Sequence, residues 1–145
     1  MKTDNRRFEP AETHHENLKD RTKHFALRII KLHSALPKHG AGYVLGNQIL
    51  RSGTSPGAQY REAQRAKSDA DFISKIETAL QELDETIFWL ELLGESAIVP
   101  PRRLESLHKE AEELVAIFVT IVNNIKRRKR SKSKVTALKE SLKEG

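Results

Sequence analysis

Two Glu-x-x-His spacings are the first residues in the chain that could do chemistry: Glu12 with His15, and Glu105 with His108. Glu and His three positions apart share a helix face, and two such pairs with two further glutamates form the di-iron site of some four-helix bundles. The apolar spacing argues against that site, because Leu104 belongs to the core-facing series and leaves Glu105 outside. The other expected helices place no glutamate on their core side, so we predict no metal site.

Other catalytic groupings fail on their residue types. The chain has no cysteine, which excludes a thiol nucleophile, a thiolate zinc site and a disulfide. The segment from Gly53 to Gly57 lacks the Lys-Ser/Thr ending of a phosphate-binding loop. His24, His33 and His39 are scattered along the first expected helix and the residues just after it. Histidines in such positions are commonly solvated or partly packed and do not form a site. We therefore predict no catalytic residues, no cofactor and no enzymatic activity.

A cluster of positive charge near the C-terminus is the clearest functional signal. Residues 126–145 hold nine basic and two acidic side chains and so have a net charge of +7. The whole chain has a net charge of +6, so residues 1–125 carry −1 and are close to neutral. Such a cluster attracts the backbone of RNA or DNA by releasing counterions, without reading sequence. The candidate residues of this basic segment are Lys126, Arg127, Arg128, Lys129, Arg130, Lys132 and Lys134. The alternative is a solubilising tail that binds nothing specific.

A second, weaker basic patch is expected in the middle of the chain. Arg51, Arg61 and Arg65 fall within an arc of about 80° on one helix, opposite its apolar side. Glu62 lies beside them and offsets part of their charge. No aromatic platform for bases is interleaved with these arginines, so we expect contacts to phosphates only.

The composition limits the class of protein further. The chain has 145 residues, of which 37% are hydrophobic, enough for one domain with an ordinary core. Its first residues lack the apolar stretch of a secretion signal, and nowhere do 18 uncharged apolar residues run together. We therefore expect a cytoplasmic protein without membrane contact.

The elements that position these residues are helices, since every strong pattern has a period near 3.6. The spacing predicts helices over about 17–36, 42–66, 68–94 and 100–127. Ser68 supplies an N-cap for the third, and two prolines introduce the fourth. In the second, Pro56 either bends one helix or splits it at a loop; the preserved apolar spacing favours one bent helix.

The predicted fold class is therefore all-α. Four helices with short connections indicate an antiparallel up-down-up-down bundle over residues 17–127. A polar N-terminal segment over 1–16 precedes it, and a flexible, weakly amphipathic basic tail over 128–145 follows it.

The end of the third helix has more apolar surface than one bundle needs. Apolar side chains occupy nearly every face of residues 87–93, which predicts a subunit interface. Its candidate residues are Phe88, Trp89 and Leu92.

Four short pieces of sequence point to a known family: LRS at 50–52 with small residues to Gly57, YREA at 60–63, Ser68 with DFI at 71–73, and ET at 85–86 leading into WLEL at 89–92. With these pieces the chain from about Asn17 to Ile125 resembles the bacterial 23S ribosomal RNA intervening sequence protein family, also called the four-helix bundle protein family. The resemblance implies a ring-like homo-oligomer, with a pentamer as its subunit number. A related branch, the accessory variability determinant of diversity-generating retroelements, implies a reverse transcriptase and RNA as partners. The resemblance supplies no catalytic residues.

The function predicted from the sequence is a non-enzymatic oligomer that binds structured RNA or a ribonucleoprotein electrostatically. Two alternatives stay open: a structural or protein-binding scaffold, and an accessory subunit of a reverse transcriptase.

Overall fold

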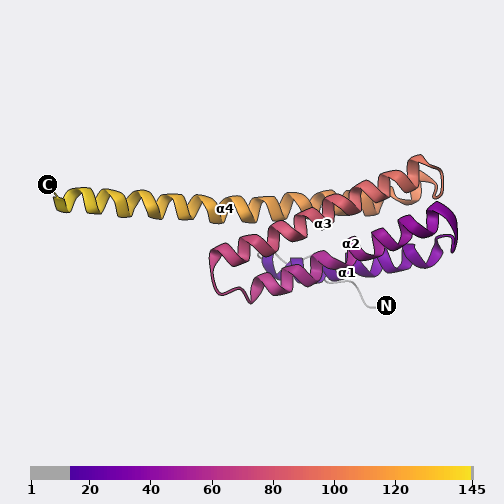
Figure 1. Ribbon diagram of the computed structural model, residues 1–145, viewed down its shortest axis with the longest axis horizontal. Coiled ribbons are helices and arrows are strands. Elements are labelled where there is room, and N and C mark those ends of the chain that lie inside the picture. The colour runs from indigo at the N-terminus through magenta and orange to yellow at the C-terminus, as the bar shows by residue number, and fades with distance from the viewer. Residues whose placement is uncertain (1–13, 145) are drawn as a thin grey trace, which may run out of the picture.

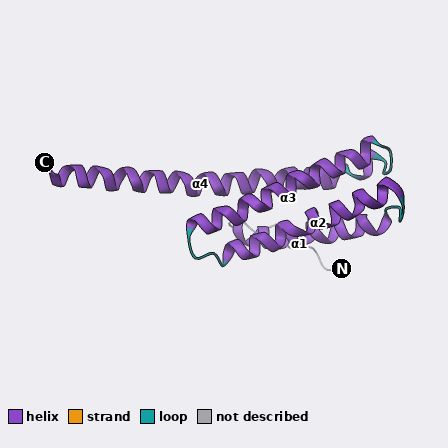
Figure 2. Ribbon diagram, in the orientation of Figure 1, coloured by secondary structure: helices purple, strands orange, loops and turns teal. Residues whose placement is uncertain are grey.

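The structure is a computed structural model that describes residues 14–144. Its helices are α1 (His14–Ala35), α2 (Gly40–Gln64), α3 (Asp69–Glu95), a short 3-10 helix η2 (Pro101–Arg103) and α4 (Glu105–Glu144). No strand occurs within this described range. The all-helical class and the four predicted helices are thus confirmed, with short connections at the helix ends (Figure 2).

The helix α2 is one continuous helix that contains Pro56. The preserved apolar spacing on both sides of this proline predicted a single helix, and the loop that would have split it is absent from the described chain. The small residues of α2 let α1 approach closely: a Cβ atom placed on Gly53 would lie 2.6 Å from Cγ1 of Ile29. A larger residue at this position would separate the two helices.

The start of α3 is fixed by its cap. The Ser68 side chain accepts a hydrogen bond from the backbone N–H of Asp71 at 3.1 Å, as the sequence predicted. Asp69 and Asp71 in the first turn add favourable charge at the helix N-terminus.

The core lies along the middle of the helices and receives side chains from all four. Contacts join α1 to α2, α2 to α3, α3 to α4 and α1 to α4. Tyr60 of α2 is fully buried and its ring meets that of Phe118 of α4, with ring centroids 5.8 Å apart. The sequence had not placed Tyr60 in the core. Burial raises the pKa of its hydroxyl.

One polar contact lies inside this core. The hydroxyl of Thr86 is hydrogen-bonded at 2.8 Å to that of Ser52, and both residues are fully buried. The Thr86 hydroxyl also lies 2.8 Å from the carbonyl oxygen of Glu82, so the pair joins α2 to α3 without leaving an unpaired group.

The prediction that the fourth helix ends near Arg127 is wrong. The core ends at Ile125, but α4 continues to Glu144 with every later side chain exposed. This C-terminal part of α4 extends beyond the other helices (Figure 1). Most of its residues are Lys, Arg, Leu, Ala or Glu, which favour helices, and it has no proline or glycine, so the helix propagates from the packed part without a new nucleus.

Candidate nucleic-acid interface

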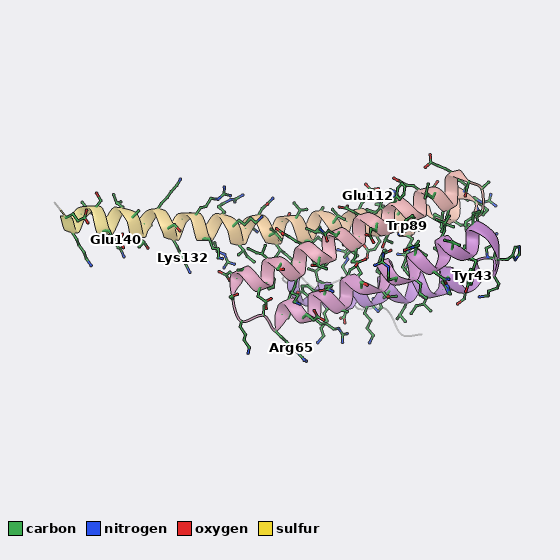
Figure 3. All side chains as sticks on the ribbon, viewed as in Figure 1. Tyr43, Arg65, Trp89, Glu112, Lys132 and Glu140 are labelled. Carbon is green, nitrogen blue, oxygen red and sulfur yellow. The ribbon has the colours of Figure 1, made fainter. Side chains whose placement is uncertain are left out.

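The basic segment lies on the projecting part of α4, close to the point where the core ends. Its cations extend into solvent around the helix, as at the labelled Lys132 (Figure 3). Lys126 is the exception, because its Nζ lies 3.1 Å from a carboxylate oxygen of Glu77 on α3. The other six cations form no ion pair with any residue that the structure describes: Arg127, Arg128, Lys129, Arg130, Lys132 and Lys134.

These six side chains span about 10 Å along the axis and, at about 100° per residue, point to all sides of the helix. No acidic residue lies among them. A polyanion can therefore approach this part of α4 from any direction and meet several cations at once. The arrangement suits contacts to a phosphate backbone, which need charge and not a fixed orientation.

The arginine patch of α2 is smaller than the sequence suggested. Arg51 contacts two carboxylates of α3, Glu82 at 3.0 Å and Glu85 at 2.7 Å. The hydrogen bond to Glu85, aided by the charge of both carboxylates, raises the pKa of Arg51. Arg51 thus already has anionic partners within the chain, which reduces its availability for phosphate.

Arg61 and Arg65 differ from Arg51, since both are exposed and form no ion pair within the described residues. Arg61 lines a shallow hollow of about 330 Å³ between α1 and α2. Lys23 of α1 lines the same hollow. Sequence reasoning missed Lys23, because only the packing of α1 on α2 brings the two cations together.

Arg21 of α1 forms the ion pairs that join α1 to α4. Its guanidinium is hydrogen-bonded to Glu110 through both Nε and Nη2, and Nη2 lies 2.9 Å from Glu113. The hydrogen bond to Glu110 is the main cause of the raised pKa of Arg21. Arg21, like Arg51, thus already has anionic partners within the chain.

Only one of the two Glu-x-x-His pairs lies wholly within the described residues. Glu12 lies outside the described residues, so the first is not located. Glu105 is exposed, as expected, and His108 contacts Glu91 at 3.4 Å and Glu112 at 2.6 Å. Within residues 14–144 no group of three His, Asp or Glu side chains is placed to hold a metal ion.

The three predicted interface residues differ in exposure. Phe88 is 51% exposed, whereas Trp89 and Leu92 are partly buried, and Trp89 packs against the chain's own core. The rings of Phe88 and Trp89 lie 5.2 Å apart. The indole N–H of Trp89 is buried and has no hydrogen-bond partner in the described part of the chain. Of the three, Phe88 is therefore the most exposed to solvent.

Among the described helices none is long and apolar enough to span a membrane.

Residues 16–120 match the family described as 23S rRNA-intervening sequence protein. Among solved structures, the chain is similar to a protein of Bacteroides thetaiotaomicron VPI-5482, described as a protein with unknown function from the S23 ribosomal protein family. The two are 41% identical, over 72% of this chain and 97% of that chain, with a TM-score of 0.69. No curated protein matches the chain.

Proposed function

Because the chain belongs to the 23S rRNA-intervening sequence protein family, we propose that it is a non-enzymatic, cytoplasmic protein that binds structured RNA or a ribonucleoprotein electrostatically. The projecting part of α4 is the principal contact, and Arg61, Arg65 and Lys23 form a secondary one. The observation that carries the proposal is the set of six exposed, unpaired cations between Arg127 and Lys134. The family match ends at residue 120, so this contact is argued from its own chemistry.

The proposed architecture is an antiparallel up-down-up-down bundle assembled as a ring-like homo-oligomer, with a pentamer as the subunit number that the family suggests. Assembly would place several basic helices on one particle. Several weak phosphate contacts then act together, because each bound arm raises the effective concentration of the next.

The proposal is tested by a salt titration of binding to a structured RNA with nuclease-treated protein. We expect the logarithm of the binding constant to fall against the logarithm of salt concentration with a slope of about −3 to −6, as four to seven phosphate contacts predict. Replacing Arg127, Arg128, Lys129 and Arg130 with glutamine should flatten this slope by about three.

The matched control removes the same charge elsewhere. Four exposed cations outside the basic segment are replaced with glutamine: Lys38, Lys67, Arg102 and Arg103. This variant should keep the slope of the unchanged protein. If the slope flattens equally in the two variants, net charge and not the projecting helix explains binding. If the unchanged protein fails to bind RNA near physiological salt, the RNA proposal is wrong.

A second candidate function, a structural or protein-binding scaffold, is favoured by the exposure of Phe88. The third, an accessory subunit of a reverse transcriptase, combines both kinds of contact. The genes that neighbour this one distinguish them: a position inside a ribosomal RNA gene favours the RNA proposal, and a position beside a reverse transcriptase favours the third.

For the assembly, we expect Phe88→Asp to produce smaller particles in light scattering. Subunit association should weaken about tenfold or more, because a charge would replace an aromatic side chain that the proposed interface buries. Phe88 is a cleaner test than Trp89, since replacing the partly buried Trp89 would also disturb the core. Ala116→Asp, at an exposed position of α4, is the control and should leave the mass unchanged. Equal masses for Phe88→Asp and the unchanged protein would remove Phe88 from the interface.

A further inference from the structure

A groove with an acidic rim lies where the end of α3 meets the start of α4. Its volume is about 460 Å³. The floor is apolar and includes Leu90 and Leu104, which are 2% and 5% exposed. The rim carries four glutamates, one lysine and one histidine: Glu91, Glu95, Glu105, Glu112, Lys109 and His108, of which His108 contacts Glu91 and Glu112. We call this surface the acidic groove; it fits an apolar segment with positive charge on its flanks.

The last turns of α4 have the complementary pattern. Val135, Leu138 and Leu142 are 51%, 62% and 73% exposed and lie within an arc of about 60° on the helix. We call these three residues the tail stripe. No other part of the described chain covers them.

The basic residues lie beside the tail stripe, and the acidic residues lie on the opposite face of the helix. At about 100° per residue, Lys134 flanks it on one side, and Lys132, Lys139 and Lys143 flank it on the other. The two acids of this segment, Glu140 and Glu144, lie on the opposite face, about 155–165° away. The helix thus presents an apolar strip between lysines, which is the counterpart of an apolar floor between glutamates.

The two surfaces cannot meet within one chain. Both lie on the same continuous helix, with about 45 Å of axis between His108 in the acidic groove and Leu138 in the tail stripe. The groove lies at the end of the molecule where α3 connects to α4, and the tail stripe projects from the other end (Figure 1). The groove of one copy is therefore open to the tail of another.

We propose that the tail stripe of one copy occupies the acidic groove of a second copy of this chain. The lengths agree, since Val135 to Leu142 spans about 10 Å and the α4 side of the groove, from Glu105 to Glu112, also spans about 10 Å. The contact joins two different surfaces, so repeating it closes a ring or extends a chain of subunits. Arg127 to Arg130 lie outside it and stay available to phosphate. Lys132 and Lys134 flank the stripe and also belong to the basic segment, so docking uses two of the six cations proposed for phosphate; docking itself does not require RNA.

The absence of cysteine from the chain allows a direct test in the full-length protein. Glu112→Cys on the groove rim is mixed with Lys139→Cys beside the tail stripe under mild oxidation. We expect disulfide-linked dimers of the two variants to form about tenfold faster than when Glu112→Cys is mixed with Ala137→Cys, because docking raises the effective concentration of only the first pair. Ala137 lies on the far side of the tail helix, about 135° from the stripe.

A second pair of variants separates the stripe from simple charge. Leu138→Asp added to Lys139→Cys should reduce cross-linking to the control rate, whereas Ala137→Asp added to Lys139→Cys should leave it fast. Both changes alter the net charge equally, so any effect on RNA binding is the same for both. Equal cross-linking by these two variants would overturn the proposal. Equal cross-linking of Glu112→Cys with Lys139→Cys and with Ala137→Cys would also overturn it, and binding of the unchanged protein to vesicles of anionic lipid would then assign the stripe to a membrane surface.

Discussion

Replacing Phe118 with alanine is expected to lower the free energy of unfolding by about 3–5 kcal/mol. Phe118 lies on α4 and is fully buried, and its ring is tilted at 37° against that of Tyr60 from α2. The helices α2 and α4 share no direct backbone contact, so these two rings bridge the centre of the molecule. Removing one ring leaves a cavity that the surrounding helices can fill only in part.

The measurement is chemical denaturation followed by circular dichroism, at one fixed protein concentration because the proposed self-association would also contribute to apparent stability. The control is Val119→Ala at the next position of α4, where the side chain is 40% exposed. We expect Val119→Ala to cost less than about 1 kcal/mol. Similar losses for the two variants would show that the position of Phe118 in the core is wrong.

The helices and the core could be predicted because the information is local. Apolar side chains at steps of three and four determine which face of each helix is buried, and Ser68 determines where α3 begins. The same spacing on both sides of Pro56 was sufficient to predict one helix across the proline. None of these predictions needed the position of another helix.

The candidate site could be predicted only in part, because pairing between helices depends on their register. The sequence indicates that Arg51 faces outward, but Glu82 and Glu85 of α3 reach it only because α2 and α3 pack at this level. The helical spacing likewise gave no signal for Lys23 beside Arg61.

The length of α4 was missed for a different reason. The core-facing apolar series ends at Ile125, which predicts the end of packing but does not by itself predict the end of the helix. Packing and helix formation are separate: once a helix is nucleated, each further residue adds one backbone hydrogen bond at little cost. The residues from Lys126 to Glu144 lack both glycine and proline, so no local signal stops the helix. Packing therefore ends at Ile125 and the helix at Glu144.

Gly53→Leu is expected to lower the free energy of unfolding by about 3 kcal/mol or more, because it overpacks the contact between α1 and α2. Even a Cβ atom at this position would lie 2.6, 2.9 and 3.0 Å from three side-chain carbons of Ile29. Both residues are buried, so neither helix can move the clash into solvent. The gain in helix propensity from replacing glycine, about 1 kcal/mol, does not offset this cost.

The cause of that loss can be isolated with Ile29→Ala, which removes the three carbons that the new side chain would meet. Ile29→Ala alone should cost about 2–5 kcal/mol through the cavity that it creates. In the double variant the leucine at position 53 grows into this cavity, so we expect a combined loss smaller than the sum of the two single losses by about 2 kcal/mol. Additive losses would mean that Gly53 does not face Ile29. A double variant more stable than either single one would show that the volume shared by the two positions, and not the identity of either residue, determines how closely α1 approaches α2.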